Sequence, residues 1–326
     1  MAIRTVVVGA GRMGKNHVRT VLASPRFQLV AVVDPARPQL AGAPAVPVVP
    51  AIADVPGAFD LAIVAAPTAH HHELGKALLA AGTHVLLEKP LASTAAAARE
   101  LAALARATGA KLAVGHVERF NPAVAKLAEV IRSGLLGAPI HFSFTRVGGY
   151  PSTVLAGNDV LLDLAVHDID VFSSLCGDCR LIASQTHVTT PQPVADTATM
   201  LLRSASGVTA DIHTNWITPT KIRQIRVTGT AGVCFVDYIL QTCELWGGNL
   251  LTRIAPAEVD FDRLRTIYAN ADKIHFAVET REPLMLQLDQ LADYLERDEV
   301  GRLCLADTAA ATVAIAEAAR LDAGAA

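Results

Sequence analysis

A pattern of glycines near the amino terminus constrains this chain more than any other feature. Gly9, Gly11 and Gly14 form the pattern G-x-G-x-x-G, which follows an apolar run at residues 3–8 and opens a helical pattern that continues to about residue 22. In this setting the first glycine permits a tight turn, the second lets the backbone approach a pyrophosphate, and the third lets helix and strand pack closely. The amino terminus of the helix then faces negative charge. The pattern therefore predicts a strand–turn–helix unit that binds a dinucleotide.

An acidic residue follows at the spacing that such units use. Asp34 lies twenty residues after Gly14, at the end of a second apolar run at residues 27–34. Its carboxylate would accept hydrogen bonds from the adenosine ribose hydroxyls and would repel a 2′-phosphate, which favours NAD over NADP. Arg37, three residues later, is the kind of side chain that accommodates a 2′-phosphate, so the sequence alone leaves NADP open.

The remainder of the first 118 residues alternates between strand and helix patterns. Residues 35–57, rich in Pro, Ala and Gly, are expected to form a loose connection. Strands that alternate with helices imply right-handed crossovers and a parallel sheet. The further strands are expected at 60–67, 83–90 and 111–116, and the further helices at 70–82 and 93–109.

After residue 118 the rhythm changes to short strands separated by turn signals, which suggest an antiparallel sheet. The elements expected here are helices at about 122–133 and 160–175, a strand at 139–147, six strands between 180 and about 255, and helices at 282–297 and 306–320. We therefore expect an α/β protein with a Rossmann-type parallel-sheet domain at 1–118 and an α+β domain at 119–326. The last two helices are candidates to pack back on the first domain.

Charge and composition exclude several classes of protein. The 326 residues carry 28 Lys and Arg against 31 Asp and Glu, and the absence of a basic run argues against a nucleic-acid-binding protein. The first residues lack a signal-peptide layout, and prolines interrupt the longest charge-free run, so no membrane span is expected. Five scattered cysteines favour a cytoplasmic location. Cys176 and Cys179 have metal-like spacing, but no second pair follows, and no metal is expected.

A charged turn ends one of the buried strands. The apolar run before Glu88 stops abruptly at Glu88-Lys89-Pro90, which we call the EKP turn. Charge is costly at the end of a buried strand unless it is paired or used. In an open parallel sheet, ligands bind beyond the carboxyl ends of the strands, where Pro67 and Thr68 also lie. The charges of the EKP turn are therefore expected to face a polar crevice rather than the core.

A helix in the second half supplies an acid and a base. Asp163 and His167 are four residues apart, which places them on one face of an α-helix, whereas Asp168 lies about 100° around the helix from His167. The carboxylate could orient the imidazole, which would remove a proton from a substrate hydroxyl, while Lys89 donates a hydrogen bond to the reacting oxygen. The alternative is a structural acid–histidine pair on a solvated helix face.

Polar residues elsewhere are candidates for the cofactor and the substrate. His116, Glu118, Arg119 and Asn121 follow the fifth strand and should line the same crevice, with Arg119 as a hydrogen-bond donor to substrate. Arg146, Lys221 and Arg223 are candidates to bind the diphosphate of a nucleotide-sugar. Lys221 and Arg223 would share one strand face by the two-residue period, but both are equally explained as solvated strand residues.

With these residues in view, the chain resembles the Gfo/Idh/MocA family of sugar oxidoreductases over nearly its whole length. The matching segments are GAGRMG, PTAHHHELGKALLAAGTHVLLEKPL, GHVERFNPAV and DLAVHDID. The resemblance implies a catalytic site of Lys89, Asp163 and His167, places the family histidine at His71, and implies an open-faced antiparallel sheet often used for oligomer contacts. One departure is AGNDVLLD, where family members often have consecutive glycines.

Further segments (NWITPTKIRQIRVTGTAG and VDYILQ) resemble the subgroup of UDP-N-acetylglucosamine 3-dehydrogenases. This resemblance implies oxidation of the sugar 3-hydroxyl to a ketone, a downstream PLP-dependent aminotransferase, and a homodimer or homotetramer. The alternatives are a dehydrogenase of a free sugar or cyclitol, and a nicotinamide-binding regulator without turnover.

The candidate site residues form two overlapping sets. The set for the cofactor is Gly9, Gly11, Arg12, Met13, Gly14, Asp34, Pro67, Thr68, His71, Glu88, Lys89 and His116. The set for the substrate is Lys89, Glu118, Arg119, Asn121, Arg146, Asp163, His167, Lys221 and Arg223.

Overall fold

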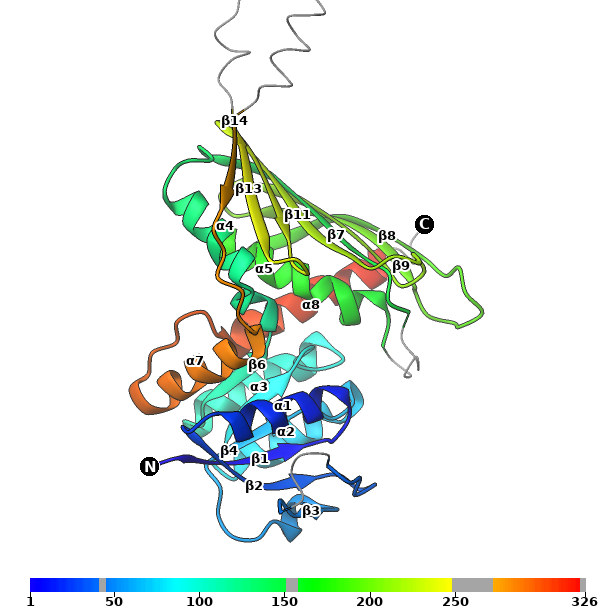
Figure 1. The fold of residues 1–326 in the computed structure, drawn as a ribbon. Helices are drawn as coiled ribbons and strands as arrows, with labels where there is room; N and C mark the ends of the chain where they lie inside the picture. The colour runs from blue at the N-terminus through cyan, green and yellow to red at the C-terminus, as the bar shows by residue number, and fades with distance from the viewer. Residues whose placement is uncertain (41–44, 151–157, 248–271, 323–326) are drawn as a thin grey trace, which may run out of the picture. The chain divides into compact units, whose positions relative to one another are not determined.

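The computed structural model describes residues 1–40, 45–150, 158–247 and 272–322. Within this part of the chain, contacts define two compact units (Figure 1). Unit 1 contains residues 1–120, 158–170 and 282–321, and unit 2 contains most of 121–281. The chain therefore passes between the units several times, and the assignment of residues 1–118 and 119–326 to two domains remains a prediction.

Unit 1 is built on a sheet whose described strands run in the order β15-β6-β5-β4-β1-β2-β3. All neighbours are parallel except β15, which pairs antiparallel with β6. Near-continuous apolar runs such as Leu61–Val64 are buried on both faces, as a parallel sheet requires. This confirms the predicted Rossmann-type sheet. Its strands are β1 (Ile3–Val8), β2 (Phe27–Val33), β3 (Val48–Val49), β4 (Leu61–Val64), β5 (His84–Glu88), β6 (Leu112–Gly115) and β15 (Cys304–Leu305).

The helices of unit 1 cover this sheet and carry part of the site. Residues 35–57, expected to be a loose connection, include the two-residue strand β3 beside β2 and the short helix η1 (Ile52–Asp54). Pro47 and Pro50 flank β3, and because proline is typical of loops, the sequence does not indicate a strand there. The other helices are α1 (Arg12–Ala23), η2 (Thr68–His70), α2 (His71–Ala80), α3 (Ala95–Thr108), η3 (Val117–Phe120), η4 (Leu161–Ala165), the first turns of α5 (Val166–Cys176), α7 (Pro283–Arg297) and α8 (Ala306–Asp322).

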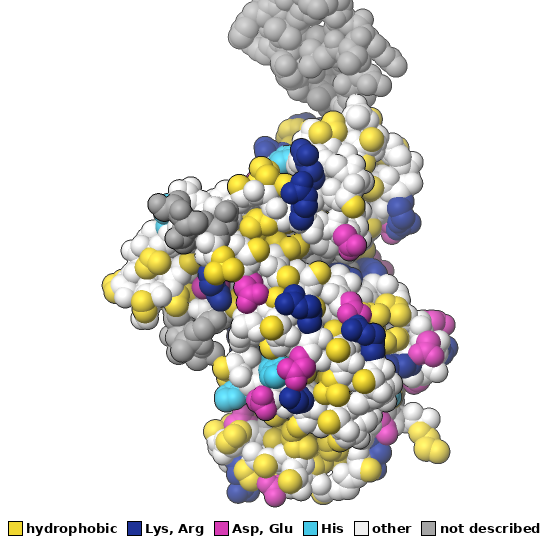
Figure 2. All heavy atoms as spheres, turned by 180° about the vertical axis from the view of Figure 1, so that it is seen from behind, with side chains coloured by type: hydrophobic (Ala, Val, Ile, Leu, Met, Phe, Trp, Pro, Cys, Tyr) yellow, Lys and Arg dark blue, Asp and Glu magenta, His cyan; other side chains and the backbone are white. Residues whose placement is uncertain are grey.

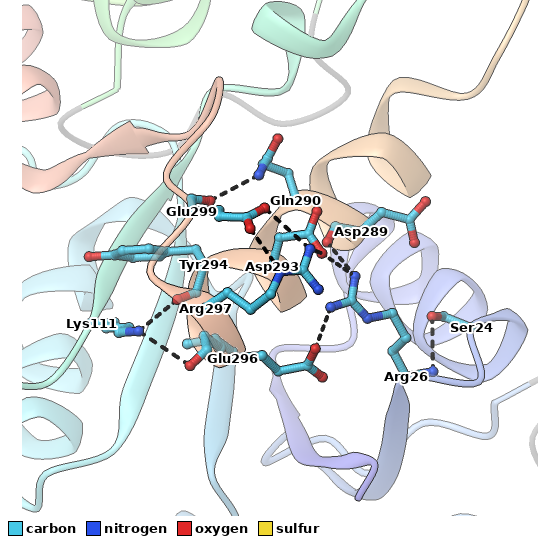
Figure 3. Close-up of polar contacts among 11 residues, drawn as sticks. Ser24, Arg26, Lys111, Asp289, Gln290, Asp293, Tyr294, Glu296, Arg297 and Glu299 are labelled. Atoms are coloured by element: carbon cyan, nitrogen blue, oxygen red, sulfur yellow. Dashed lines mark hydrogen bonds and ion pairs between the residues drawn. The ribbon is translucent and has the colours of Figure 1, made fainter.

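Helix α7, although late in the sequence, belongs to unit 1 and contacts α1. Its buried Leu288 and Leu291 join the core around Val21, and each such leucine contributes roughly 1.5–3 kcal/mol of hydrophobic stabilisation. Figure 3 shows the polar contacts beside this core. Arg26 donates to Asp293 at 2.6 Å and to Glu296 at 2.6 Å, and Lys111 donates to two carbonyl oxygens near the end of α7.

Unit 2 contains a large sheet in the order β14-β13-β12-β11-β7-β10-β9-β8, antiparallel except for β7 and β10. Along β9 the burial alternates residue by residue, so one face is covered and the other is open. On the covered face, Phe142 and Phe144 of β7 contact Phe172 of α5 with ring centroids 5.4 and 6.4 Å away, and α4 (Pro122–Arg132) packs on β12 and β13. The predicted open-faced antiparallel sheet is confirmed (Figure 1).

The strands of this sheet have the following bounds. They are β7 (Pro139–Val147), β8 (Cys179–His187), β9 (Thr197–Ser204), β10 (Thr209–Asn215), β11 (Ile222–Gly229), β12 (Gly232–Asp237), β13 (Thr242–Gly247) and β14 (Asp272–Phe276).

The surface is mixed in character. On the face drawn in Figure 2, Lys and Arg side chains alternate with Asp and Glu, and hydrophobic side chains lie between them. Among the described residues, no helix is long and apolar enough to cross a membrane.

Candidate active site

The glycine loop has the geometry that its sequence predicts. Gly9 has a φ of +95°, and a Cβ there would lie 2.7 Å from the carbonyl oxygen of Ala65. A Cβ at Gly14 would lie 1.9 Å from the oxygen of Gly9, whereas one at Gly11 would meet nothing within 4 Å. Gly9 therefore permits the turn, Gly14 permits close packing, and Gly11 faces open space. No side chain caps α1 at Gly11, so its first amides suit the pyrophosphate of a dinucleotide.

Asp34 follows β2 and is fixed above this loop. Its Oδ2 accepts a hydrogen bond from the amide of Ala10 at 2.8 Å, and its Oδ1 accepts one from the amide of Ala36 at 2.9 Å. A carboxylate has about four acceptor sites, so it keeps capacity for the hydroxyls of a ribose. Arg37 is exposed and has a left-handed backbone with a φ of 45°. Arg12 and Met13 begin α1 next to the loop, and Arg12 is exposed.

The EKP turn brings together two of the three predicted catalytic residues. Lys89 Nζ donates to Oδ1 of Asp163 at 3.0 Å and to its backbone oxygen at 2.7 Å. Both side chains are partly exposed, at 17% and 29%. Asp163 lies in η4, a π-helical segment, so the α-helical spacing that predicted its common face with His167 does not apply unchanged there. His167 is half-buried in the first turn of α5, and Asp168 is buried.

The acid Asp159 supports the start of this helix. Its Oδ1 accepts from the amide of Leu162 at 3.0 Å, and its Oδ2 pairs with Arg320 of α8 at 2.7 Å. In the segment AGNDVLLD, where family members often have consecutive glycines, Asp159 therefore acts as an acidic cap of the helix. Residues 156–157 of this segment lie outside the described part of the chain. Asp159 is absent from the predicted site residues, although an aspartate just before an apolar helical run is a cap signal.

Glu88 corrects one prediction about the EKP turn. Its carboxylate does not face an open crevice, because the residue is only 6% exposed and Oε1 lies 2.7 Å from Nε2 of His17 on α1. Burial alone would raise the pKa of Glu88, but the hydrogen bond from His17 and the nearby Lys89 and His71 outweigh it and hold the pKa below its usual value. His17, three residues after Gly14 on the inner face of α1, has no sequence signal that marks it as this partner.

His71 links the EKP turn to the end of β4. Its Nδ1 lies 2.8 Å from the carbonyl oxygen of Pro90, and its Nε2 lies 2.9 Å from that of Ala66. Burial lowers the pKa of His71, so a neutral ring donates to only one of these oxygens at a time. Pro67 and Thr68 follow Ala66 and begin η2, as expected for a strand end. The predicted cofactor contacts of His71, Pro67 and Thr68 remain predictions.

A buried group lies at the end of β6. Arg119 donates to both carboxylate oxygens of Asp170, each at 2.7 Å, and His116 Nδ1 lies 3.7 Å from the same carboxylate. Burial lowers the pKa of Arg119, but the charge of Asp170 and its hydrogen bonds outweigh burial and raise it. This geometry speaks against the predicted substrate contact of Arg119, because its guanidinium is occupied inside unit 1. Glu118 is half-buried in η3, and its predicted role stays open.

Among the described residues, this buried group also contains side chains of the types that bind metal ions. His116, Asp170 and Cys304 offer ligand atoms within 4.8 Å of one another, all buried. However, Arg119 already neutralises Asp170, and burial raises the pKa of the Cys304 thiol well above its usual value. The cluster therefore suits an ion pair beside a neutral thiol better than a metal ion.

The predicted substrate residues of unit 2 have mostly internal partners. Asn121 caps α4 by accepting from Ala123 at 3.1 Å, and Arg146 is buried 4.7 Å from the ring centroid of Tyr238. Arg223 is buried and donates to the carbonyl oxygens of Val147 and Gly148. Lys221 is exposed and directly precedes β11, whereas Arg223 is buried within β11, and their predicted common strand face remains a prediction.

Comparison with known proteins agrees with the two-unit structure. Residues 3–116 match the model of an oxidoreductase family with an NAD-binding Rossmann fold, and residues 124–234 match the Gfo/Idh/MocA C-terminal domain. A UDP-N-acetylglucosamine 3-dehydrogenase of Acidithiobacillus ferrooxidans is 26% identical over 247 residues, 75% of this chain and 77% of that protein. Inositol 2-dehydrogenase 1 of Saccharopolyspora erythraea is 30% identical over 227 residues, 65% of this chain and 67% of that protein.

The solved structure of UDP-N-acetylglucosamine 3-dehydrogenase GnnA from Acidithiobacillus ferrooxidans superposes with a TM-score of 0.83 at 22% identity, covering 100% of this chain and 99% of the other. At this identity the similarity shows a shared fold. The glycine loop, the acid after β2 and both matched domains lead to one conclusion: the chain belongs to the Gfo/Idh/MocA family of NAD-binding oxidoreductases.

Proposed function

We propose that this oxidoreductase is a dehydrogenase that oxidises a secondary hydroxyl of a sugar to a ketone, with Lys89, Asp163 and His167 at its reaction centre. The observation that carries the proposal is the contact of Lys89 Nζ with both the carboxylate and the backbone oxygen of Asp163. This contact orients an ammonium group beyond the carboxyl end of β5, where ligands of parallel sheets bind. A partly exposed cation held in this way is suited to contact an incoming oxygen atom.

The chemistry requires a proton acceptor and a group that stabilises negative charge on oxygen. The glycine loop and Asp34 would hold NAD⁺, which would supply the hydride acceptor. We assign removal of the hydroxyl proton to His167, whose residue type titrates near neutral pH. Lys89 donates a hydrogen bond to the oxygen as charge develops on it, and Asp163 holds Lys89 in place. Lys89 remains the alternative proton acceptor.

For the substrate we propose the 3-hydroxyl of UDP-N-acetylglucosamine, whose keto product an aminotransferase would aminate. The similarity in sequence to the 3-dehydrogenase of Acidithiobacillus ferrooxidans supports this choice. The second candidate is a cyclitol, which the inositol 2-dehydrogenase of Saccharopolyspora erythraea supports at 30% identity. Of the predicted diphosphate ligands, Lys221 is the exposed one, and Arg146 and Arg223 are buried.

A panel of substrates separates these candidates. NADH formation is measured with UDP-N-acetylglucosamine, UDP-glucose, myo-inositol and scyllo-inositol, with a PLP-dependent aminotransferase and an amino donor added to consume an unstable ketone. We expect the fastest turnover with UDP-N-acetylglucosamine, and competition by UDP that weakens as salt rises. Turnover of an inositol without UDP binding would instead favour the cyclitol, and no turnover of any member would contradict the dehydrogenase proposal.

We also propose a cytoplasmic homodimer or homotetramer formed through the open face of the unit 2 sheet. Large apolar side chains are exposed on this face, including Leu201 and Trp246. The odd number and scattered positions of the five cysteines in the sequence support the proposed compartment. Light scattering of the purified protein measures the mass, and Leu201→Glu is expected to shift it toward the monomer. A monomeric wild type would contradict the proposal.

A further inference from the structure

The proposed catalytic lysine is attached to the glycine-loop helix through a buried hydrogen bond. His17 on α1 is 1% exposed, and its Nε2 lies 2.7 Å from Oε1 of Glu88, the last residue of β5. The helix that carries His17 has Gly11 as its N-cap, where a dinucleotide pyrophosphate is expected. The residue after Glu88 is Lys89. A single hydrogen bond therefore joins the helix of the cofactor loop to the strand end that carries the lysine.

The carboxylate of Glu88 is held on three sides. Oε1 meets His17, and Oε2 accepts from the amide of Lys89 at 3.3 Å. On the third side, a Cβ at Gly115 of β6 would lie 2.9 Å from the carboxyl carbon, so only glycine leaves room for it. Such a carboxylate is closed off from a substrate, and its described hydrogen bonds lead to the backbone of Lys89 and to α1.

We propose that His17 is a positioning residue, which acts through Glu88 to fix the EKP turn and thereby aims Lys89 at the reacting oxygen. This inference rests on the proposed function, because it needs Lys89 to act in the reaction. His17 touches neither substrate nor reacting atoms in this role. It matters because a displacement of about 1 Å in a reacting group can cost on the order of 100-fold in rate.

The charge of Glu88 makes the pair testable by pH. The groups that face this carboxylate are His17 from α1, His71 from α2, the adjacent Lys89, and His116 after β6. With His17 in place the pKa of Glu88 is lowered, so the carboxylate stays ionised near neutral pH. Without His17, burial becomes the dominant influence and raises the pKa of Glu88. The carboxyl then gains a proton as pH falls, and the turn loses its charged partner.

The experiment compares turnover of the fastest substrate in the panel across pH for four variants. His17→Leu is expected to lower kcat by on the order of 10–100-fold, to leave KM nearly unchanged, and to add a limb on the acid side of the profile. His17→Gln, which can still donate to Glu88, should restore most of the rate. The double variant His17→Leu with Glu88→Gln should lose the added limb. Thr20→Val removes a buried hydroxyl of the same helix that donates to the carbonyl of His17, and should lower Tm without changing kcat or the profile.

The inference is overturned if His17→Leu keeps wild-type kcat, or if its acid limb persists when Glu88 is replaced. If His17→Leu does not fold, Gly115→Ala displaces the Glu88 carboxyl from the β6 side, and unchanged kcat in that variant overturns the inference equally. Lys89→Met is measured in parallel. A fully active Lys89→Met contradicts the proposed function itself, whereas an inactive Lys89→Met with a normal His17→Leu contradicts only the role of His17.

Discussion

Cationic side chains in the two units have different surroundings. In unit 1, Lys89 follows the carboxyl end of β5, is partly exposed and contacts Asp163. In unit 2, Arg223 lies within a sheet strand, is buried and donates to backbone oxygens of Val147 and Gly148. A charged group at the end of a parallel strand lies at the edge of the sheet and stays partly exposed. A charged group on the covered face of a sheet is instead enclosed by protein. The difference teaches that burial and position on the sheet, rather than the presence of a backbone partner, separate a cation suited to function from one suited to folding.

The strongest test of this comparison is Lys89→Met. The variant keeps the length of the side chain but removes its charge and donors, so kcat should fall on the order of 10²–10⁴-fold, the range of a positioned acid–base group. The affinity for NAD⁺, measured by fluorescence titration, should survive because the glycine loop is unchanged. His167→Asn should lose a similar factor if it removes the substrate proton. Lys76→Met, which replaces an exposed lysine of α2 paired with Glu100, is the matched control, and a comparable loss there would break the comparison.

Asp163→Asn should cost less than Lys89→Met. Lys89 Nζ keeps the backbone oxygen of residue 163 as a partner, because that contact does not depend on the side chain. We expect kcat to fall by on the order of tenfold if the carboxylate only orients Lys89. A loss as large as that of His167→Asn would make Asp163 itself the base. Asp159→Asn is the control, since it caps the same helix and should lower Tm with kcat unchanged.

Arg223→Met tests the other side of the comparison. The variant leaves the carbonyl oxygens of Val147 and Gly148 without their buried donor, which typically costs about 1–3 kcal/mol of stability. Urea denaturation should show this loss, while kcat and inhibition by UDP change little. Arg180→Met, at an exposed arginine on β8, should leave stability nearly unchanged. A selective loss of UDP binding in Arg223→Met would instead assign Arg223 to the diphosphate.

Asp34→Ala addresses the cofactor end of unit 1. Its carboxylate would repel the 2′-phosphate of NADP⁺, so its removal should narrow the preference for NAD⁺ by roughly tenfold, equivalent to about 1.4 kcal/mol. The affinity for NAD⁺ should also fall, because Asp34 accepts from the amide of Ala10 in the loop. Titration with both cofactors measures the ratio. Arg37→Ala should shift the ratio in the opposite direction, and a wild type that prefers NADP⁺ would contradict the role of Asp34.

Sequence reasoning succeeded where local pattern and topology agree. The glycines and Asp34 are close in the chain, and the strand-end rule placed Lys89 at the edge of the sheet. It failed where the partner is distant. Glu88 was expected to face a crevice because His17, 71 residues away, gives no signal beyond an ordinary helix position. The pairing of Arg119 with an acid 51 residues later was invisible for the same reason, and the carbonyl partners of Arg223 have no side-chain signature at all.

The smallest expected effect concerns His71, which tests whether every residue at these strand ends is functional. Burial lowers the pKa of His71 from the ordinary value of 6.5, so the folded protein binds fewer protons at this site than the unfolded chain. Its contribution to stability is therefore complete above pH 6.5 and is lost progressively as pH falls toward the lower folded value. In His71→Gln, which cannot titrate, the free energy of unfolding should depend less steeply on pH in that window. The amide can still donate to one carbonyl oxygen, so kcat should stay within a few-fold of wild type. A large rise in the Kd for NAD⁺ would instead show that His71 contacts the cofactor, and the distinction between binding and structural strand-end residues would need to be redrawn.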